Sequence, residues 1–528
     1  MAQQRGKQKG ISPEVRSLGA GAARTASFVM IGKFSSIIFL GLAFIVIARL
    51  LGPSEYGIYT LALAVAGFTG AIGNLGVGTA LNKFIPQHLY RKDMRAIEDI
   101  LANSFFITLI MGIVIAVITA ALSGIIAADV FHNPSYALVI EIAAISIIAS
   151  MLFSTSYSAL LGFNKGIYIA AINTTQAVLQ STLGVALVLL GFGPAGPIIG
   201  MIIGYTAAFL YSLYLIYQKH GLRMLVRPSG KSIKRLFSFS VPIGVSGATL
   251  SISSNLAFIA VGAFATAAVV GNLGVASKVN SLIDIVSGSI SVSLLTMYSA
   301  TLVSRVKSKI SKLYNHTIYY SFVLLAPMLL FVFVLATPFS YVAFSAKYSL
   351  APLFIAVMAI GALIALAGQY ANTLLTSANM VRDVLKYSVI VSAVTLVLIP
   401  VLIPTFKGIG LVLLLYIIAP ILTNVLFIRR SSQLFKLGFK AGKLYRILAA
   451  NAITMLLVTP LIFLWGGNYI PLLITAAIEI IVVYPVVLGL IKGVDRRDVI
   501  VMTAMTGGIP VVSRIIGWLL SYAGRFVS

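Results

Sequence analysis

The sequence predicts an all-α, polytopic membrane protein with about fourteen transmembrane helices. We expect two six-helix bundles related by a parallel repeat, followed by two extra C-terminal helices. Three observations lead to this prediction: an apolar composition, a series of long apolar runs, and a self-similarity at a fixed offset. Hydrophobic residues make up 59% of the 528 residues and charged residues only 9%. Because a soluble domain carries about 25% charged residues, only a lipid bilayer accommodates this much apolar surface.

The apolar runs are long enough to cross a bilayer, which takes about 20 helical residues. The first six predicted spans cover residues 25–49, 57–82, 101–126, 136–161, 168–190 and 196–217. The next six cover residues 240–264, 270–298, 315–337, 349–377, 387–404 and 409–428. The last pair covers residues 445–466 and 469–491.

The outer turn between the first two spans is marked by a break in the apolar pattern. Gly52 and Pro53 end the first helix, and we expect Glu55 and Tyr56 to lie at the water boundary. Glycine and proline commonly punctuate helices in this way. The break therefore predicts a tight turn within an otherwise apolar stretch.

The remaining segments are polar or basic, and they divide the chain into parts. We predict a disordered cytosolic tail over 1–23 and an amphipathic interfacial helix over 493–528, with a fifteenth span as the alternative for the latter. The predicted parts between these ends are an N-lobe over 24–218, a basic linker over 219–239, a C-lobe over 240–428, a basic loop over 429–444 and a final helix pair over 445–492.

The distribution of positive charge supports the span map. Cytoplasmic loops of membrane proteins carry an excess of Lys and Arg. With the N-terminus inside, 33 of the 38 Lys and Arg residues fall on the cytosolic side. The outer connections hold only Arg49, Lys347 and Lys407. We therefore expect a plasma-membrane protein with both termini in the cytoplasm. Its net charge of +26 favours contact with anionic membrane lipids over any nucleic-acid partner.

A shift of 214 residues aligns several landmarks of the two halves. The aligned pairs are Gly57 with Gly271, Ala62 with Ala276, Arg91 with Arg305, Leu160 with Leu374, Leu161 with Leu375, and Gly196 with Gly410. Six spans plus six spans that both start from the cytosol are related by an axis along the membrane normal. Such a parallel repeat favours two bundles that alternate access to a site between them.

No combination of residues in the chain indicates catalysis, a cofactor or a metal site. There is no cysteine, and the four histidines are scattered at or near span ends. The stretch PSGKS at 228–232 is similar to a phosphate loop, but Leu225 stands where the first glycine of that motif is required. We therefore expect a protein that is not an enzyme.

Ionisable side chains inside predicted spans are costly in lipid, so each is a candidate for function. The five are Lys33, Glu141, Lys278, Asp284 and Glu479. We assign substrate binding to Lys33, Lys278 and Asp284, although Lys33 could also extend to the cytosolic interface. Coupling or charge pairing is assigned to Asp284, Glu141 and Glu479; for Glu141 solvation at the outer interface, and for Glu479 a packing contact, is an equal alternative.

Uncharged polar side chains form stripes along four predicted spans. In the fifth span Asn173, Gln176 and Gln180 share one face, which favours a hydrated cavity that binds substrate. The other stripes are Ser277, Ser281, Asp284, Gly288 and Ser291 in the eighth span, Ser246, Thr249 and Ser253 in the seventh, and Gln369, Asn372, Thr373 and Thr376 in the tenth. For the Ser/Thr stripes we favour helix–helix packing, where small polar residues are common, over a hydrated cavity. For the amides of the fifth span, packing is the alternative.

Several stretches resemble polysaccharide-biosynthesis flippases, which move lipid-linked oligosaccharides such as O-antigen units. These belong to the superfamily that also contains MATE drug exporters and lipid II flippases. The resemblance lies in ARLLGPSEYGIYTLALAV (48–65), GVGTALNKFIP (76–86), LFSFSVPIG (236–244) and FSAKYSLAPLFIAVMAIGAL (344–363). It implies a two-lobed bundle. Members often carry Asp or Arg in the seventh span, where this chain has Asn255.

Three functions remain open on these observations. The resemblance implies a flippase that moves a polyprenyl phosphate- or diphosphate-linked sugar outward by alternating access, with glycosyltransferases or a polymerase of the same pathway as further partners. The alternative is a proton- or sodium-coupled exporter of cationic small molecules, for which Asp284 and Glu141 would be suitable carboxylates. The third is a membrane scaffold for glycosyltransferases that transports nothing.

Overall fold

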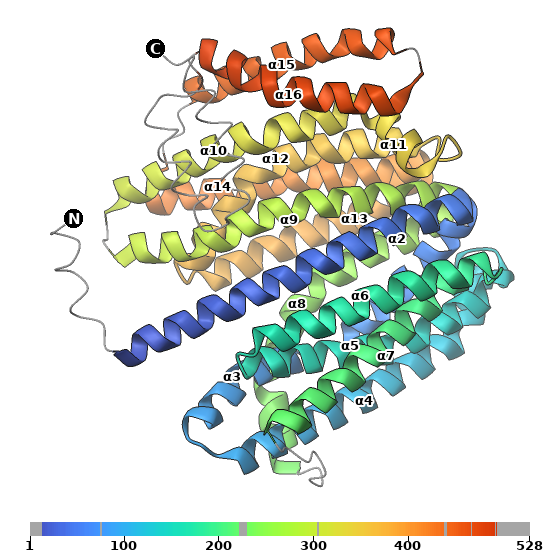
Figure 1. Cartoon of the computed structure of the whole chain (residues 1–528), viewed down its shortest axis with the longest axis vertical. Coiled ribbons are helices and arrows are strands. Elements are labelled where there is room, and N and C mark those ends of the chain that lie inside the picture. Colours follow the sequence, from blue (N-terminus) through green and yellow to red (C-terminus); the bar gives the residue numbers. More distant parts are fainter. Residues whose placement is uncertain are drawn as a thin grey trace. The chain divides into compact units, whose positions relative to one another are not determined.

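The computed structural model describes residues 13–73, 76–220, 230–303, 306–437, 441–465, 467–491 and 493. All regular elements in these ranges are helices, which confirms the all-α prediction (Figure 1). The chain divides into two compact units, Met1–Val270 and Gly271–Ser528. Parts of three predicted features lie outside the described residues: residues 1–12 of the tail over 1–23, residues 221–229 of the linker over 219–239, and residues 494–528 of the C-terminal helix over 493–528. The described part of the linker from Gly230 onward is helical.

Unit 1 is a helical bundle in which α6 packs against both α2 and α7, and α4 packs against α5. Its long helices are α2 (Pro13–Gly73), α3 (Val77–Tyr90), α4 (Met94–Ile125), α5 (Ala137–Gly162), α6 (Gly166–Leu189), α7 (Ala195–His220) and α8 (Gly230–Phe264). The turn between α4 and α5 contains the π-helical η2 (Ile126–Val130) and the 3₁₀ turn η3 (Pro134–Tyr136). Because α2 begins at Pro13, residues 13–23 are helical, contrary to the predicted disordered tail.

The predicted break between the first two spans lies inside α2. Gly52 has φ 70° and ψ 175°, which is not helical and which glycine adopts without a Cβ clash. The rings of Phe44 and Tyr56 lie 6.1 Å apart, although twelve residues of straight helix would separate them by about 18 Å. The chain therefore folds back at Gly52. Tyr56 is only 2% exposed and does not lie at the water boundary as predicted, whereas Glu55 is exposed.

The second predicted span, 57–82, is not one continuous helix. Helix α2 ends at Gly73 and α3 begins at Val77. Between them, Gly76 adopts φ 70°, and the space that a Cβ would need is occupied by backbone atoms of Ser240 and Gly244 in α8. Only glycine allows both this conformation and this close approach, which explains why the helix is interrupted here.

Helix α8 lies in unit 1. It packs against α2, α3 and α4, whereas the sequence analysis assigned residues 240–264 to the C-lobe. Glycines make the contact close: Gly67 faces the side chain of Asn255, and Gly262 faces Leu61 and Phe131. These contacts bring α8 near α2 and tie it to the first unit.

Unit 2 contains the remaining helices, with α12 packed against α10, α13 and α14. They are α9 (Ala267–Val303), of which residues 267–270 belong to unit 1, α10 (Lys307–Val334), α11 (Ala336–Phe344), α12 (Ala351–Ser377), α13 (Val381–Leu413), the π-helical η4 (Leu414–Ile418), α14 (Ala419–Phe435), α15 (Ala441–Leu464) and α16 (Tyr469–Leu490). The short α11 was not expected from the sequence. Lys407 lies in the connection predicted between the eleventh and twelfth spans, and its φ of 49° and ψ of −128° break α13 at this residue.

The C-terminal helix pair, α15 and α16, packs against α10 and α11. A buried cluster that includes Tyr319, Ile447 and Tyr484 joins these helices near one end. The hydroxyl of Tyr484 donates to the carbonyl oxygen of Val323 at 3.0 Å. The pair is therefore held to the rest of unit 2 by apolar packing and by at least one polar bond.

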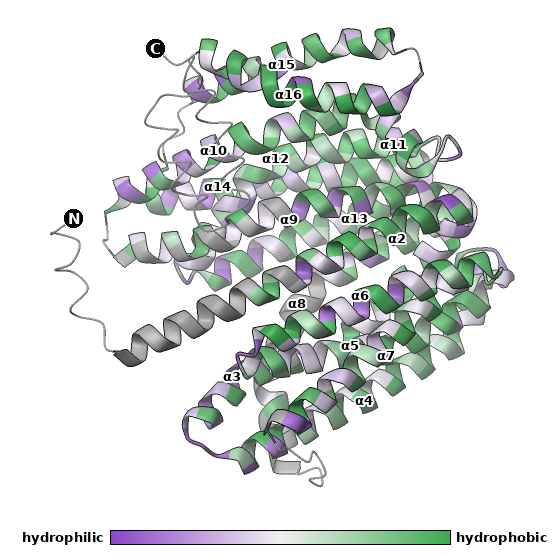
Figure 2. Cartoon of the chain, viewed as in Figure 1, coloured by the Kyte–Doolittle hydropathy of each residue, from purple (hydrophilic) through white to green (hydrophobic). Residues whose placement is uncertain are grey.

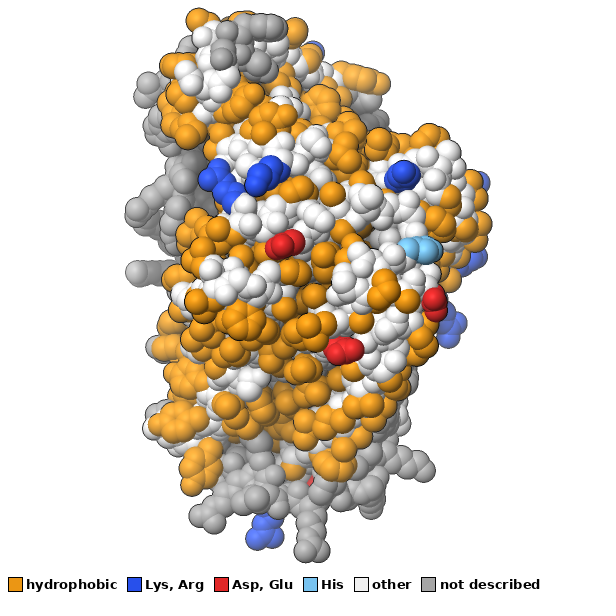
Figure 3. Space-filling view, turned by 90° about the vertical axis from the view of Figure 1, so that its right-hand side faces the viewer, with side chains coloured by type: hydrophobic (Ala, Val, Ile, Leu, Met, Phe, Trp, Pro, Cys, Tyr) orange, Lys and Arg blue, Asp and Glu red, His pale blue; other side chains and the backbone are white. Residues whose placement is uncertain are grey.

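Length and composition mark ten helical stretches of the described residues as candidate membrane spans. Two of them, Phe28–Gly73 and Val381–Phe435, contain the breaks at Gly52 and Lys407. Hydrophilic residues are most frequent in connections and at helix ends, and the helix middles are mainly apolar, with polar patches such as those on α6 (Figure 2). The face in Figure 3 is covered mainly by hydrophobic side chains with a few separate charges. The chain is thus a multi-pass membrane protein, and the number fourteen stays a prediction.

Candidate functional site

Helix α9 carries two of the predicted site residues, Lys278 and Asp284. Both side chains are exposed, and the two residues are separated by about 9 Å along the helix axis. The carboxylate of Asp284 accepts a hydrogen bond from Asn280 Nδ2 at 3.0 Å. The ion pairs recorded within the described residues involve neither Lys278 nor Asp284. Lys278 therefore presents its charge outward from α9 without a salt bridge in this part of the chain.

Tyr416, in η4, lies beside the same stretch of α9. Its side chain lies near Ser277 and the carboxylate of Asp284, and the buried Ser277 hydroxyl makes no hydrogen bond within the described residues. Ser277 and Asp284 belong to the polar stripe predicted for the eighth span, whereas Tyr416 belongs to no predicted stripe. A tyrosine in an apolar run gives little signal by itself, because aromatic residues are ordinary in spans.

The polar stripes of the eighth and tenth predicted spans meet in a pocket of about 210 Å³. Its lining residues are Ser291 and Leu295 from α9, and Asn372, Thr373 and Thr376 from α12. We call this pocket the α9–α12 groove. At its edge the hydroxyl of Ser377 donates to the carbonyl of Leu295 at 3.3 Å. Hydroxyl and amide groups with one apolar side chain form an uncharged polar surface.

The threonine hydroxyls of the groove also bond within their own helix. Thr373 donates to the carbonyl of Gln369 at 3.0 Å, and Thr376 donates to the carbonyl of Asn372 at 2.9 Å. Each hydroxyl oxygen still has lone pairs that can accept a hydrogen bond. The groove is therefore able to accept hydrogen bonds from a hydroxyl-rich molecule.

The amides predicted in the fifth span lie on α6 in unit 1. Gln176 is buried, and its side-chain amide nitrogen, Nε2, donates a hydrogen bond to Oε1 of Gln180. The hydroxyl of Ser36 donates to the backbone carbonyl of Asn173 at 3.1 Å, which joins α2 to α6. Lys33 lies one helical turn before Ser36 and is exposed. Unit 1 thus brings Lys33 and the three amides onto neighbouring helices.

The other two predicted carboxylates are in different surroundings. Glu141 on α5 is exposed and accepts a hydrogen bond from the buried Ser123 of α4 at 3.0 Å. Glu479 is partly buried on α16, and no hydrogen bond is recorded for its side chain within the described residues. Glu141 belongs to unit 1, whereas Glu479 belongs to the C-terminal helix pair.

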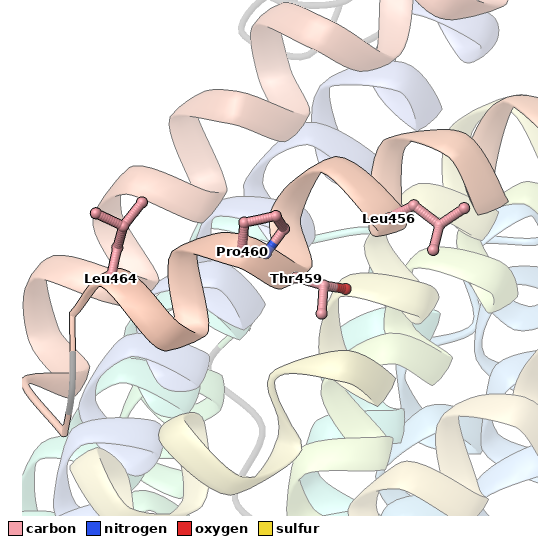
Figure 4. Close-up of a pocket in the computed structure, with 4 residues that line it drawn as sticks. All are labelled: Leu456, Thr459, Pro460 and Leu464. Atoms are coloured by element: carbon pink, nitrogen blue, oxygen red, sulfur yellow. The ribbon is translucent and has the colours of Figure 1, made fainter.

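An apolar hollow of about 510 Å³ lies on α15. Its four lining residues, Leu456, Thr459, Pro460 and Leu464, all come from this one helix (Figure 4). The hydroxyl of Thr459 donates to the carbonyl of Met455. With no charged side chain in its lining, the hollow has the character of a lipid-facing surface.

Known structures share this fold. The lipid II flippase MurJ, in its inward closed conformation, matches with a TM-score of 0.72 and 16% identity over 90% of this chain and 100% of that chain. An inward-facing multidrug resistance MATE family transporter of the MOP superfamily matches with a TM-score of 0.62 and 14% identity over 77% of this chain and 99% of that chain. A MOP superfamily transporter from Pyrococcus furiosus matches with a TM-score of 0.52 and 16% identity over 78% and 96% of the two chains.

Sequence comparison supports the same relationship. No curated protein matches the chain. The family model described as polysaccharide biosynthesis protein matches residues 46–351, which is more than half of the chain. These residues include Lys278, Asp284 and Ser291. The matched range, together with the fold of the MOP superfamily, shows that this chain belongs to the polysaccharide biosynthesis protein family.

Proposed function

We propose that this protein is a flippase that moves a polyprenyl phosphate- or diphosphate-linked oligosaccharide from the cytosolic to the outer leaflet by alternating access. The observation that carries the proposal is the surface of α9, where Lys278 stands a few turns from the α9–α12 groove. A lysine attracts a phosphate, and the attraction grows as the local dielectric falls. The neutral hydroxyls and amides of the groove are suited to sugar hydroxyl groups.

The direction of transport follows from the charge of the substrate. Moving one negative charge outward across an inside-negative potential gains about 2.3 kcal/mol per 100 mV. Such a protein needs no catalytic residue, and we propose that it is not an enzyme. We place it in the plasma membrane with both termini in the cytoplasm, where glycosyltransferases or a polymerase would supply or consume the substrate.

The fold similarity to a MATE transporter and the carboxylates Asp284 and Glu141 favour a second candidate function. A proton- or sodium-coupled exporter of cationic compounds would use those carboxylates to bind its substrate or coupling ion. Lys278 is adverse to that function, because a cation near the site repels a cationic substrate. Drug resistance conferred on a pump-deficient host would support the exporter.

Reconstitution tests the flippase directly. Proteoliposomes with a fluorescent lipid-linked oligosaccharide are expected to expose the label to an outside reagent faster than empty liposomes. Equal rates with and without protein would contradict the proposal.

The variant Lys278→Gln tests the residue that carries it. Because a hydrogen bond to a charged group contributes about 1.5–3 kcal/mol, we expect the substrate concentration for half-maximal transport to rise about tenfold or more. The matched control is Lys347→Gln, which removes an exposed lysine in the connection before α12. Equal effects of the two variants would show that total charge, and not Lys278, matters.

A further inference from the structure

Side chains of two neighbouring helices donate hydrogen bonds to the backbone in the middle of α12. The donor and acceptor pairs are Asn424 with Ile364 at 2.6 Å, Tyr314 with Ala367 at 2.9 Å, and Ser431 with Ala371 at 3.4 Å. Asn424 and Ser431 lie on α14, and Tyr314 lies on α10. The helix is thus held through its carbonyl oxygens, whose second lone pairs are available for this purpose.

Asn424 differs from the other two donors because it makes a second bond to α12. Its Oδ1 accepts a hydrogen bond from the backbone N–H of Gly368 at 2.6 Å, while its Nδ2 donates to the carbonyl of Ile364. In an α-helix the N–H of one residue bonds to the carbonyl four residues earlier. Gly368 and Ile364 are such a pair, so one amide side chain bonds both members of a single helical turn.

The glycine at 368 allows this approach. The space that a Cβ would need there is occupied by the side chain and backbone of Asn424. One heptad earlier, Gly361 faces the backbone carbonyl of Tyr416 in the same way. Two glycines on one face of α12 therefore let the backbone of the η4–α14 segment lie directly against it.

This arrangement has a consequence for bending. A helix bends where a side chain enters the ladder of backbone bonds, and in lipid each backbone group left unpaired costs several kcal/mol. The amide of Asn424 keeps the N–H of Gly368 and the carbonyl of Ile364 paired if their own bond lengthens. Asn372, Thr373 and Thr376 of the α9–α12 groove follow directly after this turn.

We propose that Asn424 is a positioning residue and that the 364–368 turn is a hinge of α12. Bending at the hinge moves the C-terminal part of α12, with its groove residues, relative to α9. Asn424 touches no substrate in this account; it sets the geometry of the groove that does. The hinge does not depend on the proposed flippase function. Of the tests of the hinge, only the transport measurement depends on that function.

Disulfide cross-linking measures the hinge without substrate. The chain has no cysteine, so Leu295→Cys and Ser377→Cys form a single pair at the edge of the groove, where Ser377 Oγ lies 3.3 Å from the carbonyl of Leu295. In this background Asn424→Leu removes both side-chain hydrogen bonds to α12. The N–H of Gly368 and the carbonyl of Ile364 can then pair only with each other. We expect cross-linking to be at least about fivefold slower. A rate within twofold of the unmodified pair, or a faster one, would overturn the hinge.

Two further variants separate the hinge from general packing. Ser431→Ala removes a hydrogen bond between the same two helices, one heptad away from Asn424. The cross-linking rate of this variant should stay within twofold of that of the unmodified pair. A fall in the rate equal to that caused by Asn424→Leu would overturn the proposal. Gly368→Ala with Asn424→Ala removes the amide and places a methyl group against the backbone of residue 424, where Cα and N lie 3.0 Å from the new Cβ. This double variant should cross-link as slowly as Asn424→Leu; wild-type cross-linking would contradict the proposal.

Transport gives an independent measurement. With the lipid-linked oligosaccharide assay, Asn424→Leu is expected to lower the maximal rate at least about fivefold and to leave the half-saturating concentration within twofold. If only the half-saturating concentration changes and the maximal rate does not, Asn424 acts in substrate binding, and the hinge is refuted. If the chain does not transport this lipid at all, the flippase proposal fails, while the cross-linking result still decides the hinge.

Discussion

Single polar side chains hold neighbouring helices together by bonding to backbone carbonyls. Ser36 bonds to Asn173, and Tyr484 bonds to Val323. Such bonds are accessible inside a membrane, where water does not compete and interhelical hydrogen bonds contribute about 0.6 kcal/mol on average. Single glycines bring helices together by a different route: because glycine has no side chain, the backbones of two neighbouring helices can approach each other closely. Gly57 is the sharpest case, because it faces the backbone carbonyl of Ala267.

The variant Gly57→Ala tests this contact. A new Cβ would press against a carbonyl oxygen and force the backbone to shift, and overpacking of this kind typically destabilises by about 1–3 kcal/mol. We therefore expect a lower midpoint of thermal unfolding in detergent. The control is Gly41→Ala in the same helix, where no atom lies within 4 Å of the new methyl group. A similar loss for both variants would show that the contact with Ala267 is not the cause.

Pairs of helices determine which polar stripes become a surface. The stripes on α9 and α12 meet in the α9–α12 groove, whereas the amide Gln176 on α6 is buried and paired with Gln180. Both stripes follow the helical period, so periodicity does not distinguish them. What separates them is the neighbour: α6 packs closely on α7, where Gly204 lies against Gln176 and Gln180.

The variant Thr373→Val tests the groove. Valine has nearly the shape of threonine but no hydroxyl, so a group that bonded to the hydroxyl would lose about 1 kcal/mol. We expect transport at low substrate concentration to fall about three- to tenfold. Thr395→Val on α13 is the matched control, because Thr395 is buried and bonds to its own helix at Val391. An unchanged rate for Thr373→Val would remove this hydroxyl from the binding surface.

The division of the whole molecule into units differs from the division of its sequence into repeats. The repeat places residues 240–264 at the start of the second half, but α8 packs against α2, α3 and α4 within unit 1. A repeat reports a shared pattern of spans, not which helices move together. Alternating access with these units would carry α8 along with α2.

A cross-link inside unit 1 tests that expectation. The position of a Cβ on Gly67 lies 3.0 Å from Asn255 Cγ. The Cβ of residue 255 is one bond further back, so the two Cβ atoms are at most about 4.5 Å apart, which a disulfide can bridge. Gly67→Cys with Asn255→Cys should form a disulfide on oxidation and keep more than about half of the transport rate. Inactivation that a reducing agent reverses would show that α8 separates from α2 during transport.

The sequence by itself determined the membrane class, most helix positions, and the breaks at Gly52 and near Lys407. These features depend on composition, helical period and turn-forming residues, which act over a few turns of chain. Only the tertiary structure decided that the α9 and α12 stripes meet, that α8 joins unit 1, and that Asn424 bonds to α12. The partners of Asn424 lie about 60 residues away, and local periodicity carries no information on contacts at that separation.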